Sequence, residues 1–180
     1  MGIAIALNHL GFVITLQENP DLVEAQQLLH ESLVLFKAMD NGWGMARELY
    51  YLGHTTYALG DYRAAQRYLL DGIRTALEAQ VVPIALEALL GVAILRIKAG
   101  TIEAALELLM HILNHPASRK ETINRAGQLC AELEAQLLPQ QFEVVQTRVR
   151  ARSFTAVVQE ILSTAAAPLS YEADARPVLE

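Results

Sequence analysis

The sequence predicts an all-α protein in which antiparallel helix pairs stack one after another as an α-solenoid, with further helices capping its C-terminal end. Three observations predict this fold. The 180 residues are 53% hydrophobic but only 6% aromatic, so the core must be built from aliphatic side chains, and Ala and Leu are strong helix formers. A segment recurs at a fixed interval. Each recurrence carries the apolar spacing and turn residues of two helices.

The repeat has a period of 40 residues. Its three copies are LVEAQQLLHESL from Leu22, YRAAQRYLLDGI from Tyr62 and IEAALELLMHIL from Ile102. Equivalent positions are Ala25, Ala65 and Ala105; Leu29, Leu69 and Leu109; and Leu33, Ile73 and Leu113. A helical bundle with chance alanines is the alternative, and a period that holds twice without a gap argues against it.

Another helical stretch precedes each copy, so every unit is expected to be a helix–turn–helix. The corresponding residues are Leu49, Leu52 and Gly53 in the second unit, and Leu7, Leu10 and Gly11 in the first, with Asn19-Pro20 as a two-residue insertion. In the second unit, Gly60 can end one helix in the left-handed conformation and Asp61 can cap the next. Gly100-Thr101 repeats this arrangement, and we expect Thr101 to act as the cap.

The expected organisation is three helix pairs within residues 1–117, at about 3–38, 43–79 and 82–115. Pro116 ends the pattern. The segment Ser118-x-x-Glu121 then resembles a capping box that opens a helix to about Leu138. Pro139 begins another helix, and Ser153 caps a last one that ends at Leu162. We expect residues 118–163 to cap the solenoid and residues 164–180 to form a mobile tail.

The repeat resembles the tetratricopeptide repeat (TPR) family. The family pattern W-x2-L-G-x2-Y…A-x3-F is similar to Leu49-x2-Leu52-Gly53-x2-Thr56…Ala65-x3-Leu69. Leu replaces Trp, Thr replaces Tyr, the terminal Pro is missing, and the period exceeds the usual length of about 34 residues. Longer repeats of this kind resemble the C-terminal regions of bacterial signalling ATPases and maltose-regulon-activator-like transcriptional regulators. The resemblance covers roughly residues 3–115.

The resemblance implies a right-handed TPR-like α-solenoid from the C-terminal part of a larger cytoplasmic, bacterial signalling or transcription-regulatory protein. The first helix fits this expectation, because apolar residues surround much of Ile3–Leu16 whereas a terminal helix normally has a polar face. We therefore expect the chain to be the last part of a longer solenoid.

A stripe of polar and aromatic residues follows one side of the second unit's first helix. In the family's architecture these positions line the concave face, which binds partners. The candidate contact residues are Asn8, Phe12, Arg47, Tyr50, His54 and Tyr57. The third unit places Glu87, Leu90, Ile94 and Ile97 at the same positions. The alternative interpretation is packing, with the C-terminal helices covering the apolar positions, and the sequence leaves both open.

No motif predicts catalysis or a cofactor. Glycine-rich phosphate loops and hydrolase or metalloprotease motifs are missing, and Cys130 is the only cysteine. Glu107, His111 and His115 share a helix face, but His115 precedes a proline and helix-terminal histidines suit the dipole, so we expect no metal. The net charge is −6, and no dense basic stripe predicts nucleic-acid binding.

Arg148, Arg150 and Arg152 are close in sequence, but alternate spacing on a helix spreads them, and we expect a charged surface. Val81–Ile97 is too short and too interrupted to span a membrane. The sequence therefore favours a protein-protein interaction module that binds a peptide or a partner domain, including other domains of a parent protein, and contacts neither nucleic acid nor membrane. The alternative is a regulatory domain that senses a small molecule.

Overall fold

The computed structural model describes residues 1–164, and these residues form nine α-helices and no strand. The first six helices are α1 (Gly2–Thr15), α2 (Leu22–Ala38), α3 (Gly42–Ala58), α4 (Tyr62–Glu78), α5 (Val82–Lys98) and α6 (Ile102–Asn114). The last three are α7 (Lys120–Glu134), α8 (Pro139–Ala151) and α9 (Phe154–Thr164). The expectation of an all-α protein is confirmed.

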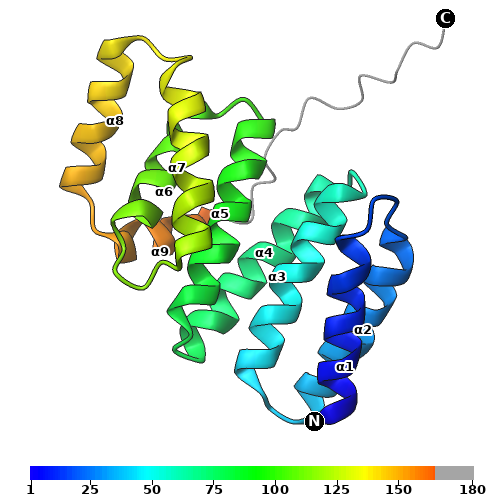
Figure 1. Ribbon diagram of the computed structural model, residues 1–180. Helices are drawn as coiled ribbons and strands as arrows, with labels where there is room; N and C mark the ends of the chain where they lie inside the picture. Colours follow the sequence, from blue (N-terminus) through cyan, green and yellow to red (C-terminus); the bar gives the residue numbers. More distant parts are fainter. Residues whose placement is uncertain (165–180) are drawn as a thin grey trace, which may run out of the picture.

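Helices that are neighbours in sequence are also neighbours in space. Each of α1 to α6 packs against the helix that follows it, α5 also contacts α3 and α7, and α8 packs on α6. The molecule accordingly extends from α1 and α2 at one end to α7 and α8 at the other (Figure 1). Of the expected C-terminal tail, Thr164 is the last residue of α9, and residues 165–180 lie outside the described residues.

Glycines let the two helices of a pair approach each other. A Cβ atom added at Gly53 would lie 2.6 Å from Leu69 Cγ, and one added at Gly11 would lie 3.0 Å from Leu29 Cγ. Gly11 and Gly53 are 42 residues apart while their leucine partners are 40 apart. The inserted two residues are therefore absorbed in the turn between α1 and α2, and the same helix contact forms in both pairs.

Leu69 also joins one pair to the next. It is buried on α4, and a Cβ atom added at Gly91 of α5 would lie 2.8 Å from its Cδ2. The same side chain thus fills the space left by a glycine in its own pair and by a glycine in the following pair. Close packing of this kind leaves little tolerance for a change in volume.

The turns within the pairs have the predicted conformation at Gly60 and Gly100 and the predicted cap at Asp61. Gly60 and Gly100 have φ angles of 83° and 73°, which glycine adopts without strain. Asp61 Oδ1 accepts a hydrogen bond from the backbone N–H of Ala64 at 2.9 Å. Thr101 is the N-cap residue of α6, as expected, but its side chain does not form the capping hydrogen bond, because its hydroxyl donates to the carbonyl of Arg96 at 3.0 Å.

The boundary of α7 differs from the expected capping box. Ser118 does not cap α7; its hydroxyl donates back to the carbonyl of Ile112 at 2.6 Å, near the end of α6. Arg119 is the N-cap residue of α7, and the helix ends at Glu134 instead of Leu138. The unsatisfied carbonyls at the end of α6 therefore compete successfully for the serine hydroxyl.

The helices α8 and α9 begin where the sequence predicted. Pro139 is the first residue of α8, where a missing N–H costs nothing. Ser153 caps α9, because its Oγ accepts from the N–H of Ala156 at 3.2 Å. The helix continues to Thr164, two residues beyond the expected end.

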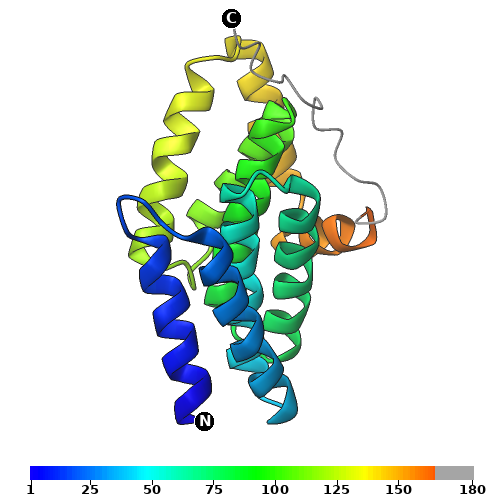
Figure 2. The same ribbon diagram turned by 90° about the vertical axis from the view of Figure 1, so that its right-hand side faces the viewer.

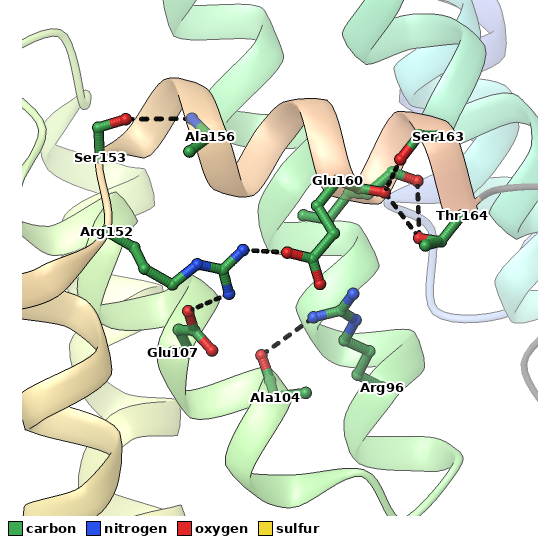
Figure 3. A network of polar contacts seen from close by, with 10 residues as sticks. Arg96, Ala104, Glu107, Arg152, Ser153, Ala156, Glu160, Ser163 and Thr164 are labelled. Carbon is green, nitrogen blue, oxygen red and sulfur yellow. Dashed lines mark hydrogen bonds and ion pairs between the residues drawn. The ribbon is translucent and has the colours of Figure 1, made fainter.

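Arginines of α8 and its C-terminal end attach the last helices to α6. Arg152 pairs with Glu107 of α6 at 2.9 Å and also with Glu160 of α9 (Figure 3). Arg148 pairs with Glu103 of α6 at 3.3 Å. Two of the three clustered arginines therefore serve internal ion pairs.

Candidate functional site

A groove of about 630 Å³ lies between α3, α5 and the beginning of α7. Aromatic side chains of α3 and apolar side chains of α5 line it, together with charged residues at both edges. The lining residues are Phe12, Arg47, Tyr50, Tyr51, Gly53, His54, Tyr57, Leu69, Glu87, Leu90, Gly91, Ile94, Arg119, Glu121, Thr122 and Arg125. A second hollow of about 360 Å³ continues between α1 and α3 and shares the aromatic residues.

The groove brings together five of the six candidate contact residues: Phe12, Arg47, Tyr50, His54 and Tyr57. The four residues from α3 share one helix face because they are spaced three, four and three positions apart. Phe12 comes from α1, and its ring packs at 4.8 Å from the ring of Tyr51.

Asn8 does not line the groove. It is buried between α1 and α3, and its side-chain amide donates to Glu48 Oε1 at 2.6 Å. A buried amide is most stable when it is hydrogen-bonded, and Glu48 provides the acceptor from a position 40 residues along the chain. The prediction that Asn8 belongs to the contact surface is therefore wrong.

Glu48 itself is fully buried. Ser32 donates to the carbonyl of Ala4 at 2.9 Å, and Glu48 Oε2 has no hydrogen-bond partner among the described residues. Burial raises the pKa of Glu48 to about 7, and the hydrogen bond from Asn8 acts in the opposite direction. The carboxyl group is thus close to its titration midpoint at neutral pH.

Aromatic rings form a continuous layer along α3. Tyr50 contacts Tyr51 at 5.3 Å and His54 at 4.7 Å between ring centroids. Burial raises the pKa of Tyr50 above its usual range, and the charge of Glu87 acts in the same direction. Burial lowers the pKa of His54. Both side chains are therefore neutral at physiological pH and can donate or accept hydrogen bonds.

Arg47 stands at the edge of this layer. Its guanidinium lies 4.9 Å from the centroid of Trp43 and 5.8 Å from that of Tyr51, and it donates to the Tyr51 hydroxyl at 3.1 Å. No carboxylate of residues 1–164 forms an ion pair with it, and its buried Nε has no hydrogen-bond partner in that range. Arg47 retains donors for an external acceptor.

The opposite edge is closed by an ion pair that the sequence did not predict. Arg119, at the N-cap position of α7, pairs with Glu87 of α5 at 2.8 Å. Glu87 could be placed in the groove from the 40-residue register, but Arg119 and Arg125 lie outside the repeat. Their position depends on how α7 folds back beside α5, and no sequence spacing encodes that.

The packing alternative accounts for part of the stripe. Leu90 is buried, whereas Ile94 and Ile97 remain partly exposed. Leu90 and Ile94 line the groove, and Ile97 does not. The C-terminal helices thus approach α5 without filling the space next to α3.

Two of the three possible metal ligands, Glu107 and His115, are engaged in other contacts. Glu107 pairs with Arg152 at 2.9 Å, and His115 Nδ1 accepts from the N–H of Ala117 at 3.1 Å. His111 is buried, and burial lowers its pKa. Within residues 1–164 no group of three or more potential metal ligands is found.

Two further features limit the chemistry. Burial raises the pKa of Cys130 to about 11, and the charge of Glu134 acts in the same direction, so the thiol is not activated as a nucleophile. In the part of the chain that the structure describes, every helix is too short or too polar to traverse a bilayer.

Comparisons with protein-family models, curated proteins and solved structures find no match to this chain.

Proposed function

We propose that this chain is a protein-protein interaction module, built as a right-handed TPR-like α-solenoid, whose groove binds a peptide or a partner domain. The sequential packing of helix pairs and the 40-residue repeat support the architecture. The observation that carries the function is the groove, because five of the six contact residues predicted from the repeat line it. We further propose that the module belongs to a bacterial signalling or transcription-regulatory protein in the cytoplasm.

The groove has the composition of a recognition surface. Tyr and Arg are frequent at energetically important interface positions, and the rings on α3 provide large contact areas with few rotatable bonds. Three arginines and two glutamates border the groove, although the chain as a whole has a net charge of −6. An extended peptide with apolar side chains and at least one carboxylate suits this surface.

A peptide-display selection on the intact chain tests the proposal. Selected peptides are then synthesised and their binding is measured by fluorescence polarisation. Tyr57→Ala should weaken binding at least tenfold because it removes a ring from the groove. Tyr68→Ala is the matched control, because Tyr68 lies on α4 outside the groove and hydrogen-bonds His30 at 3.0 Å. Equal loss in both variants, or no loss in either, would contradict groove binding.

A small-molecule-sensing domain is the second candidate, and the groove volume favours it. About 630 Å³ falls within the range typical of ligand pockets. Thermal-shift measurements with a metabolite library test this function. A ligand whose stabilisation disappears in Tyr57→Ala but persists in Tyr68→Ala would support it over peptide binding.

A further inference from the structure

The carboxyl group of Glu48 lies where the first helix pair packs on the second. Glu48 belongs to α3 and is 0% exposed, and its Oε1 accepts a hydrogen bond from Asn8 of α1 at 2.6 Å. Ser32 of α2 acts on the same carboxyl group and also donates to the carbonyl of Ala4 on α1 at 2.9 Å. Figure 2 looks onto this end of the molecule, where α1 and α2 lie in front. Polar groups of three helices therefore meet at one buried carboxyl group.

This carboxyl group has no partner suited to a negative charge. Among residues 1–164 Glu48 forms no ion pair, and its Oε2 has no hydrogen-bond partner. Arg47 is the charged group that acts on it, but the Arg47 guanidinium lies over Trp43 and donates to the Tyr51 hydroxyl. An ionised carboxylate is costly to bury without a paired cation. The packed arrangement therefore favours the protonated carboxyl group.

Neither α1 nor α2 brings a charge to this position. The titratable side chain of α1 is His9, which is exposed. On α2, His30 forms a hydrogen bond with Tyr68 of α4 at 3.0 Å. The charged side chains of α2 are all exposed: Glu24, Glu31 and Lys37. The proton that neutralises the site is therefore carried by Glu48 itself.

The adjacent contact in the same interface belongs to the groove. Asn8 and Phe12 are four positions apart on α1, and Glu48 and Tyr51 are three positions apart on α3, so each pair shares one helix face. The rings of Phe12 and Tyr51 pack at 4.8 Å and line both the groove and the second hollow. A change at Glu48 thus acts one helical turn away from the groove.

We propose that Glu48 is a proton-dependent switch: its protonated carboxyl group holds α1 against α3, and its ionisation loosens this contact and moves Phe12 away from Tyr51. The ionised carboxylate needs water, and water can reach it only if the interface opens. Because burial raises the pKa of Glu48 to about 7, the closed arrangement is favoured at lower pH and is lost as the pH rises through 7. The shape of the groove then depends on pH, whatever the groove binds.

Fluorine NMR of the intact chain labelled with fluorinated phenylalanine follows Phe12 directly. The chain has four phenylalanines, and the resonance that disappears in Phe12→Leu belongs to Phe12. Between about pH 5.5 and about pH 8.5 this resonance should shift with a midpoint of about 7. Phe142 of α8 is remote from α1 and serves as the internal reference, so its resonance should stay constant.

Glu48→Gln removes the titration but keeps an acceptor for the amide of Asn8, so the Phe12 resonance should become independent of pH. Glu78→Gln is the matched control, because Glu78 is exposed, and it should behave like the wild type. Burial lowers the pKa of His54, which also lines the groove. A response of Phe12 to His54 would persist in Glu48→Gln, so the two causes are separated.

Carbon NMR of the Glu48 carboxyl group measures its titration in the wild type. Equal midpoints for Glu48 and Phe12, with no Phe12 titration in Glu48→Gln, support the switch. Should Glu48→Gln fail to fold, the agreement of the two wild-type midpoints decides. A constant Phe12 resonance, unequal midpoints, an unchanged titration in Glu48→Gln or an equal titration of Phe142 would each overturn the proposal. None of these measurements uses a groove ligand, so the outcome is separate from the proposed binding function.

Discussion

The helix pairs α1–α6 and the C-terminal helices α7–α9 both rest on buried apolar packing, but they differ in the ion pairs that supplement it. Between the pairs, glycines and fully buried leucines and alanines bring the backbones close, and the ion pair of Arg74 with Asp71 is exposed on one helix. The C-terminal helices bury apolar side chains such as Leu129 and Ile161 in the same core. They also form ion pairs to earlier helices through Arg119, Arg148 and Arg152. Stacking should therefore be insensitive to salt, whereas the attachment of the last helices should respond to it.

The largest expected effect comes from the packing between pairs. Leu69→Ala should lower the free energy of unfolding by about 3–4 kcal/mol, because it removes a buried side chain that contacts two helices and leaves a cavity. Leu59→Ala is the control, since Leu59 is 40% exposed. Urea denaturation should show a change of less than about 1 kcal/mol in the control.

The buried carboxyl group of Glu48 is the exception within the pairs. Its pKa of about 7 lies above the value of 4.5 for a solvated glutamate, so the native state binds the proton more tightly than the unfolded state. The stability contributed by the protonated carboxyl of Glu48 is therefore fully present below about pH 4.5 and is lost as the pH rises through 7. Glu48→Gln should be more stable than the wild type by about 2–3 kcal/mol at pH 8.

Urea denaturation at pH 4.5 and pH 8 measures this difference. The advantage of Glu48→Gln should nearly vanish at pH 4.5, where the wild-type carboxyl is protonated in the native state and half protonated in the unfolded state. Glu78→Gln is the control, because Glu78 is exposed at the end of α4, and it should follow the wild type. An advantage of equal size at both pH values would show that titration of Glu48 is not the cause.

The smallest expected effect concerns the C-terminal attachment. Arg152→Met should lower the free energy of unfolding by about 1 kcal/mol, because it leaves the nearly buried carboxylate of Glu107 without its cation. Arg74→Met removes an exposed pair and should cost less than about 0.5 kcal/mol. Hydrogen exchange of α9 should report the loss locally. Added salt should narrow the difference between wild type and Arg152→Met.

The sequence predicted the parts of the structure that depend on local chemistry. Helix periodicity, the left-handed glycines at 60 and 100 and the Asp61 cap each involve residues within a few positions of one another. The groove residues of α3 followed from helix spacing. Asn8 could not be placed in the same way, because whether it faces the groove or Glu48 depends on how α1 and α3 pack. Arg119 and Arg125 depend on the fold of α7, beyond the last repeat.

Leu69 has a consequence for how such a chain can change over generations. Its side chain fits against the missing side chains of both Gly53 and Gly91, one in its own pair and one in the next. A larger residue at either glycine requires a smaller one at position 69, which then loosens the other junction. Neighbouring pairs are thus obliged to co-vary, and a single pair cannot be exchanged between related chains without its neighbours.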